Sequence, residues 1–237
     1  MSKLRLINIS LLLLSSTLAF SQKSDSVRAD SVVRPSFIPT GIRVGTDLIS
    51  LFKTQFQDDF SAWEVNADVD FHRYYLAIDY GGGSRTFRSD SGNYSNDGTY
   101  WRVGVDVNFL LKDPDRNMFF FGARYGQATF SQDLTVYAKN LVTHDFENLA
   151  YHDGSVNAHW YELTTGLRVK IWKMIWLGYT ARFKFGLSMD ETEHIIASDV
   201  PGYGRTYKDS AWGFNYQIFI RIPVRKQPPL AFKTKKK

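Results

Sequence analysis

The stretch WEVNADVDF, residues 63–71, alternates strictly between apolar and polar side chains. Its odd-numbered residues are all apolar, and its even-numbered residues are three acids and one amide. Successive side chains of a β-strand point to opposite faces, so the pattern predicts a strand with one apolar face and one acidic face. Which face points inward decides the fold. A soluble ligand-binding barrel buries the apolar face, whereas a membrane barrel buries the polar one.

The same period of two recurs along the rest of the chain, and no long stretch has the 3.6-residue period of a helix. The predicted strands cover residues 41–52, 63–71, 74–81, 101–111, 118–128, 161–171, 176–187 and 212–222. Short connections at 72–73, 112–117 and 172–175 alternate with longer predicted loops at 53–59, 82–99, 129–159 and 188–210. This alternation is typical of an up-and-down antiparallel meander.

Charges on the polar faces favour the membrane arrangement. Acids and bases occur there in nearly equal numbers, and a barrel of eight strands is only wide enough for its own side chains to fill it. Buried charges persist when they are paired, so these residues are expected to form salt bridges between neighbouring strands. The predicted lumen network comprises Glu64, Asp68, Asp70, Asp79, Asp106, Glu162, Arg43, Arg102, Arg124, Arg168, Arg182 and Arg221, and Asp47, Lys170 and Lys184 lie on the same faces.

Aromatic residues at the strand ends support the same arrangement. Trp63, Trp101, Tyr161 and Trp212 each open an apolar face after a long loop, and Phe71, Phe109 and Trp172 lie near the short turns. Such residues form girdles at the lipid interfaces of membrane barrels, and strands of about 9–11 residues suffice to cross. The sequence therefore predicts an all-β fold, an eight-stranded antiparallel up-and-down transmembrane β-barrel with a charged, plugged lumen.

The ends of the chain differ from its middle. Residues 1–21, with Lys3 and Arg5 before an apolar run, are expected to be a cleaved signal peptide for export to the outer membrane. Residues 22–38 are predicted as a flexible periplasmic leader, 39–224 as the barrel and 225–237 as a basic tail. Removing Lys3 and Arg5 lowers the formal charge from +5 to +3, too weakly basic for a nucleic-acid footprint. The sequence has no Cys, which excludes disulfides and a lipoprotein anchor.

Three stretches carry a resemblance to a known family: PSFIPTGIRVGTDLISL, WEVNADVDFHRYYLAIDYG and YWRVGVDVNFLLK. They are similar to an uncharacterised family of small outer-membrane β-barrel proteins of the Bacteroidota, and the resemblance covers most of the mature chain. It implies a barrel and an outer-membrane location but no established activity. The chain departs from many outer-membrane barrels in lacking a terminal aromatic residue, because a basic tail follows the last strand.

Candidate catalytic and metal-binding groups are few. Two of the three acids Glu64, Asp68 and Asp70 could form a carboxylate pair for acid/base work, but a salt-bridge role accounts for them better. His144–Asp145 and His152–Asp153 match no standard metal-ligand spacing. A lipid-modifying group at the rim would use His159 with Ser131 or Ser155. We expect no catalytic residues, no metal site and no cofactor.

The function expected from these patterns is a structural or protein-interaction role. Outer-membrane lipid surrounds such a protein, and an outer-membrane or periplasmic protein is its expected partner, as for an accessory subunit of the barrel-assembly machinery. The alternatives are a lipid-modifying enzyme with its site at the rim and a soluble ligand-binding barrel.

Overall fold

Eight antiparallel strands close into a barrel in the computed structural model, which describes residues 37–111, 113, 115–139, 146–192 and 194–225. The strands are β1 (Gly41–Asp47), β2 (Phe60–Phe71), β3 (Tyr74–Ser89), β4 (Gly92–Asn108), β5 (Met118–Lys139), β6 (Phe146–Trp172), β7 (Ile175–Met189) and β10 (Ser210–Pro223). Each pairs with its sequence neighbour among these eight, and β1 closes the ring against β10 from Gly41↔Pro223 to Asp47↔Gln217. The predicted fold is confirmed. The predicted signal peptide and most of the leader and tail lie outside the described residues.

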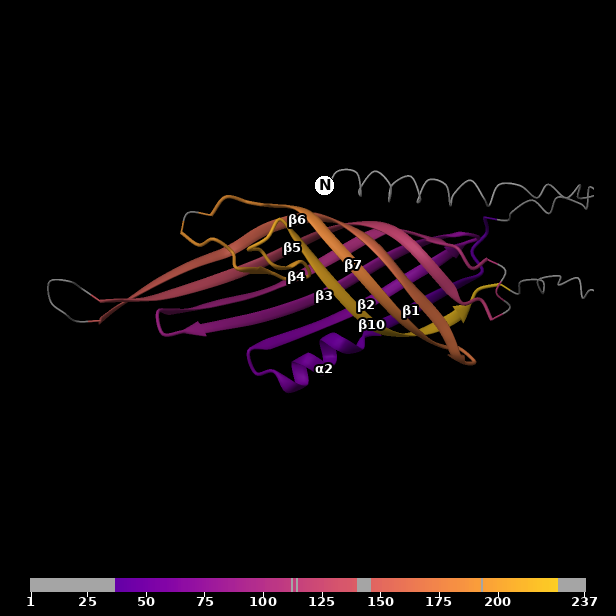
Figure 1. Cartoon of the computed structure of the whole chain (residues 1–237), viewed down its shortest axis with the longest axis horizontal. Helices are drawn as coiled ribbons and strands as arrows, with labels where there is room; N and C mark the ends of the chain where they lie inside the picture. Colours follow the sequence, from indigo (N-terminus) through magenta and orange to yellow (C-terminus); the bar gives the residue numbers. More distant parts are fainter. Residues whose placement is uncertain (1–36, 112, 114, 140–145, 193, 226–237) are drawn as a thin grey trace, which may run out of the picture. The chain divides into compact units, whose positions relative to one another are not determined.

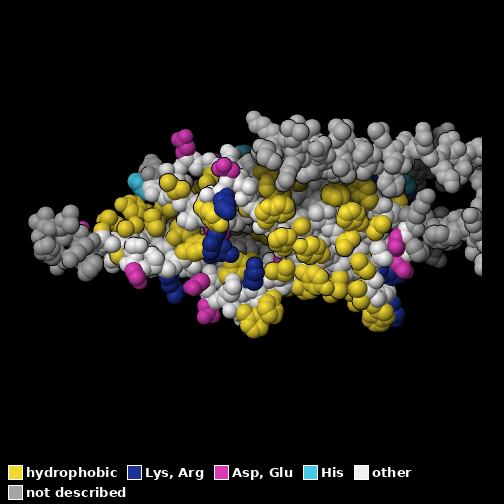
Figure 2. Space-filling model, viewed as in Figure 1, with side chains coloured by type: hydrophobic (Ala, Val, Ile, Leu, Met, Phe, Trp, Pro, Cys, Tyr) yellow, Lys and Arg dark blue, Asp and Glu magenta, His cyan; other side chains and the backbone are white. Residues whose placement is uncertain are grey.

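The barrel wall has its apolar side outward. In β2, Glu64, Asn66 and Asp68 are buried, whereas Trp63 and Val65 are 42% and 45% exposed. The other strands alternate in the same sense, and hydrophobic side chains cover much of the face shown over the strands in Figure 2. An apolar exterior around buried charges is the arrangement of a transmembrane barrel. The alternative of a soluble ligand-binding barrel is therefore wrong.

Two hairpins continue well past the predicted strand ends. β3 and β4 pair as far as Ser89↔Gly92, and β5 and β6 pair as far as Lys139↔Phe146. Both hairpins extend from the same end of the barrel, opposite the short turns (Figure 1). Most of the predicted loops 82–99 and 129–159 are therefore strand. Beyond the lipid belt the outer face no longer has to be apolar, so the alternation that predicts strands is lost while the backbone pairing continues.

β1 is shorter than predicted, because residues 48–52 belong to helix α2 (Leu48–Phe56). The Asp47 side chain accepts hydrogen bonds from the backbone N–H of Ile49 and Ser50, at 3.3 and 3.1 Å, and so caps the helix. Among the described residues, no helix is long and apolar enough to cross a membrane.

The early end of β1 leaves a notch in the barrel wall. Pairing with β1 stops at Thr46↔Val65 on one side and at Asp47↔Gln217 on the other. Residues 60–64 of β2 and 210–216 of β10 consequently have no β1 partner. Helix α2 packs beside β2 and β10 at this place (Figure 1).

The connection between β7 and β10 folds over the barrel mouth at the long-hairpin end. It contains the short strands β8 (Asp199–Val200) and β9 (Gly204–Arg205), which pair with each other. Its buried side chains pack with inward side chains of β4, β5 and β6 in one apolar cluster: Tyr100, Ala128, Phe130, Val156, Ala158, Trp160, Ala197, Val200 and Tyr203. This cluster holds the connection against the mouth.

Candidate functional site

The lumen charges form a continuous set of ion pairs across the barrel. Asp68 on β2 pairs with Arg43 Nε at 2.8 Å and with Arg168 Nη1 at 2.5 Å. Arg168 also reaches Asp106 at 3.2 Å, and Arg124 lies 3.0 Å from the same Asp106 oxygen. Because β2 and β6 lie on opposite sides of the ring, the contact between Asp68 and Arg168 spans the lumen.

Asp79 joins this half of the network to the other half. Its Oδ2 contacts Arg124, Arg182 at 3.1 Å and Arg102 at 3.3 Å, and its Oδ1 accepts a hydrogen bond from Asn66 Nδ2 at 2.8 Å. The complete network contains five acids and five bases: Glu64, Asp68, Asp79, Asp106, Glu162, Arg43, Arg102, Arg124, Arg168 and Arg182. The buried charge is therefore balanced, as the cost of desolvating ions requires.

Two predicted members lie outside this network. Asp70 and Arg221 form a separate pair at 2.9 Å near the short-turn end, where Asp70 Oδ1 also accepts the backbone N–H of Thr40 at 2.5 Å. Lys184 is buried and donates hydrogen bonds to the carbonyl oxygens of Gly202 and Tyr203.

Lys170 is exposed at the short-turn end of β6, where it lies opposite the buried Trp176 of β7. The expectation of pairing between neighbouring strands holds only in part. Arg43 and Asp68 are on neighbouring strands, but Arg182 of β7 reaches Asp79 on the opposite strand β3.

Buried aromatic rings also fill the lumen, and the sequence reasoning missed them. The Arg168 guanidinium lies 4.9 Å from the Phe120 ring centroid and 5.0 Å from that of Phe219, at distances typical of cation–π contacts. Arg43 lies over Trp176 in the same manner. The sequence does indicate these inward rings, since each occupies the same alternate positions as the polar residues of its strand.

The predicted interface aromatics lie on the outer wall. Trp63, Trp101, Tyr161, Trp212, Phe109 and Trp172 are exposed, and Phe71 is half-buried. On the long-hairpin side, ring contacts link Trp101 to Tyr125 and Tyr125 to Tyr161, each at 5.7 Å. The rings follow the wall around the barrel, as the predicted girdle requires.

The candidate rim group is not assembled. His159 pairs in register with Gln127 and is exposed on the outer wall, where its ring lies 6.1 Å from that of Tyr125. Ser155 is four residues away along the same strand, roughly 13 Å at about 3.3 Å per residue. Ser131 lies at the bulge opposite Ser155, so it is equally distant from His159.

The candidate metal ligands are not brought together either. His152 Nδ1 contacts Asp133 at 2.6 Å, whereas Asp153 accepts a hydrogen bond from Gln132, so the neighbouring His152 and Asp153 engage different partners. His144 and Asp145 lie outside the described residues. No group of three metal-ligating side chains occurs in the part of the chain that the structure describes.

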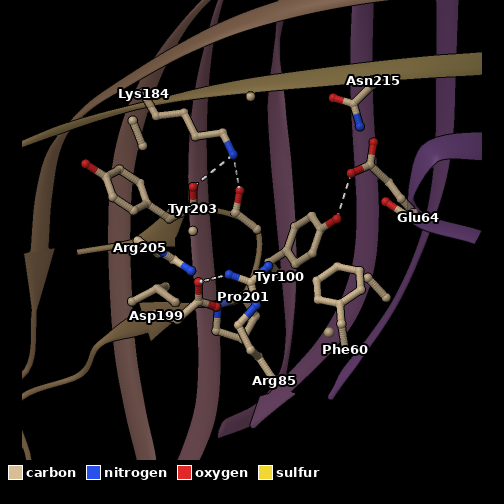
Figure 3. A pocket seen from close by; sticks show the side chains of 18 of the residues that line it. Phe60, Glu64, Arg85, Tyr100, Lys184, Asp199, Pro201, Tyr203, Arg205 and Asn215 are labelled. Carbon is tan, nitrogen blue, oxygen red and sulfur yellow. Dashed lines mark hydrogen bonds and ion pairs between the residues drawn. The ribbon is translucent and has the colours of Figure 1, made fainter. Parts of the chain in front are cut away.

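A cavity of about 770 Å³ lies at the mouth, between the lumen network and the β7–β10 connection (Figure 3). Its floor includes Glu64, Tyr100 and Arg102, where the Tyr100 hydroxyl donates to Glu64 at 2.6 Å. On another side, Arg85 forms an ion pair with Asp199 at 3.0 Å. Burial raises the pKa of Asp199, although the Arg85 charge opposes this effect.

The comparisons with known proteins give a family. The family described as a domain of unknown function, DUF6048, matches residues 3–227. The chain belongs to the DUF6048 family. No curated protein matches it significantly. Similar solved structures are the crystal structures of CarO2 and CarO of Acinetobacter baumannii, at 13% and 12% identity and a TM-score of 0.37 each, covering 78% of this chain and 98% of theirs.

In this DUF6048 chain, the buried carboxylates of the lumen contact basic side chains of the barrel itself. The lumen carboxylates are held by guanidiniums, and the three candidate rim residues are apart. General acid/base work needs a side chain within hydrogen-bond reach of a substrate, whereas these acids contact the bases of the barrel itself. The mouth cavity and the wall notch are features that the sequence did not predict.

Proposed function

We propose that the protein resides in the outer membrane as a barrel without a conducting pore or enzymatic activity, and that it acts by binding another protein. Support for the closed lumen comes from the balanced network, whose ion pair between Asp68 and Arg168 crosses the barrel. A lumen occupied in this way leaves no room for the water column that solute diffusion requires. The outer-membrane location follows from the fold class, because closed β-barrels with lipid-facing walls are characteristic of that membrane.

The observation that carries the binding role is an open sheet edge on the long β5–β6 hairpin. β6 pairs with β7 only from Ala158↔Met189 onward, so within the part of the chain that the structure describes, residues 148–156 have no strand partner on the side away from β5. An edge strand is a template for an added strand of another chain, which forms main-chain hydrogen bonds with it. Leu149 on this segment is 44% exposed and offers an apolar contact beside the backbone. A partner that adds a strand here would make the protein an accessory subunit of an outer-membrane complex, such as the barrel-assembly machinery.

Site-directed photo-crosslinking in native outer membranes tests this role. A photoreactive amino acid at Leu149 should give one discrete protein adduct, whereas the same group at Ile171, an exposed residue of the same strand at the lipid-facing end, should not. Purification without crosslinking should then recover the same partner in a fixed ratio. Absence of an adduct at Leu149, together with a monomer on native gels, would contradict the proposal.

Conductance and lipid turnover test the remaining parts. Reconstitution in planar bilayers should give no stable current steps, and outer-membrane lipid should be unchanged by the purified protein. If lipid is converted and His159→Ala abolishes the conversion, the enzymatic alternative replaces the proposal.

A further inference from the structure

The wall notch and the mouth cavity are parts of the same feature. The cavity is lined by Ile49, Ser50 and Lys53 of α2, by Phe60, Ala62 and Glu64 of β2 and by residues 210–215 of β10. These are the helix that stands in the notch and the two strand segments that lack a β1 partner. The β10 residues that line the cavity include both the inward Asn215 and the outward Trp212. The cavity therefore reaches from the lumen side to the outer wall through the notch.

The notch lies at the level of the predicted lipid interface. Trp63 and Trp212, two of the interface aromatics, stand on its two sides and are 42% and 66% exposed. Helix α2 has no buried residue and presents Phe52 and Phe56 to the outside, with their ring centroids 4.3 Å apart. Aromatic side chains that are exposed at this level contact the boundary between lipid head groups and acyl chains. An amphiphile in that layer would meet the open side of the cavity.

The charge of the cavity is positive. Six basic residues line it: Lys53, Arg85, Arg102, Lys184, Arg205 and Lys208. The three acids of the lining are already engaged: Asp47 with the N-terminus of α2, Glu64 with Arg102, and Asp199 with Arg85.

Three of the six bases remain for a ligand. Among the described residues, Lys53, Arg205 and Lys208 have no carboxylate within ion-pair distance. Arg205 is held by its contact with the Phe87 ring, at 5.6 Å from the centroid. Figure 2 shows Lys and Arg side chains gathered at one place on this face, beside the hydrophobic surface. A cationic cavity next to an exposed aromatic helix matches an anionic head group joined to an acyl chain.

We propose that the notch cavity binds an anionic phospholipid of the surrounding leaflet, with its phosphate among Lys53, Arg205 and Lys208 and its acyl chains along Phe52 and Phe56 of α2. The proposal is independent of the protein-binding role, because the cavity and residues 148–156 of β6 are different sites. Three basic side chains that each contribute about 1 kcal/mol of attraction to anionic lipid correspond to roughly 100-fold in affinity.

Native mass spectrometry of the intact, detergent-solubilised protein tests this site. Delipidated protein is titrated with palmitoyl-oleoyl phosphatidylglycerol, with the zwitterionic phosphatidylcholine of the same chains, and with inorganic phosphate. One phosphatidylglycerol should bind in preference to phosphatidylcholine, and Lys53→Gln combined with Arg205→Gln and Lys208→Gln should weaken that binding by about 100-fold. Phe52→Ser with Phe56→Ser should weaken it as well, since the chain contact is lost.

A matched control removes three bases from the opposite end. Arg116, Lys170 and Lys173 line a smaller cavity of about 200 Å³ near the short turns. Replacing these three by Gln should leave phosphatidylglycerol binding unchanged, and heat-dependent gel mobility verifies that each variant is folded. Equal affinity of the notch variant and the native protein would overturn the proposal. Full displacement of the lipid by millimolar inorganic phosphate, with no effect of the Phe substitutions, would replace it with a site for a free anion.

Discussion

Asp79→Asn is the most informative single change in the lumen, because Asp79 joins the two halves of the charge network. The substitution keeps the shape of the side chain but removes one of five buried negative charges that balance five guanidiniums. Asp79 is 2% exposed, so water cannot replace the lost partner. We expect the variant to fold with a markedly lower free energy of unfolding.

The magnitude follows from the contacts. Asp79 accepts hydrogen bonds from Arg124 and Arg182, and bonds to charged groups contribute about 1.5–3 kcal/mol each. Their sum, about 3–6 kcal/mol, agrees with the roughly 3–5 kcal/mol expected when one partner of a buried ion pair is removed. The matched control is Asp59→Asn, since Asp59 pairs with Arg88 at 3.7 Å on an exposed surface. That change should alter stability by less than about 1 kcal/mol.

Urea unfolding in lipid vesicles, followed by tryptophan fluorescence, measures these changes. A second variant separates charge balance from packing: Arg124→Met added to Asp79→Asn leaves four acids facing four bases. The double variant should lose less stability than the sum of the two single changes, by about 1–3 kcal/mol. Additive losses, or a loss for Asp79→Asn no larger than for Asp59→Asn, would refute the idea that balanced charge holds the lumen together.

Three further predictions concern the wall, the helix and the mouth. Leu167→Arg, near the middle of the lipid-facing part of β6, should cost about 2–4 kcal/mol in the same assay, and Tyr161→Arg at the interface only about 0–1 kcal/mol. Asp47→Ala removes the cap of α2 and the acceptor of the Tyr216 N–H, so it should cost about 1–2 kcal/mol and speed proteolysis of α2. Burial raises the pKa of Tyr94 to about 12, above the pKa of about 10 in the unfolded chain. The neutral hydroxyl therefore contributes its full stabilisation below about pH 10, and this contribution is lost as the pH rises through about 12. A difference titration at 295 nm between the native protein and Tyr94→Phe should isolate a tyrosine that ionises near pH 12.

The barrel could be predicted because its two determinants are local in the sequence. Alternation with period two predicts the strands, and the charges on one face of WEVNADVDF predict that this face points into the lumen. The pairing inside the lumen is different, because it depends on which residues of opposite strands share a height. That height follows from the tilt and stagger of the closed sheet, so Asp68 and Arg168 could not be matched from their strands alone.

The helix was missed because its sequence supports two interpretations. Leu48 continues the alternation of β1, but the apolar Ile49, Leu51 and Phe52 that follow it fit a helix as well as a buried strand. The deciding contact is the Asp47 carboxylate on the first turn of α2, which competes with one more pair of ladder bonds. Asp47 is an acid on the polar face of β1, so sequence reasoning assigned it to the lumen and overlooked its capacity as a cap.

The notch is costly for a barrel in lipid, and this cost bears on its purpose. Open strand edges carry unpaired backbone groups, and each such group costs several kcal/mol wherever the hydrocarbon layer reaches it. Two side chains compensate in part for the missing strand. Thr54 Oγ1 of α2 accepts the Ala62 N–H at 2.7 Å and donates to the Ala62 carbonyl at 2.9 Å. Asp47, the last residue of β1, accepts the Tyr216 N–H at 3.0 Å. A few more residues of strand after Asp47 would have supplied backbone partners for these edges without such substitutes. The helix instead keeps a cationic cavity open at the level of the lipid head groups, and a site for an anionic lipid gives that arrangement a use.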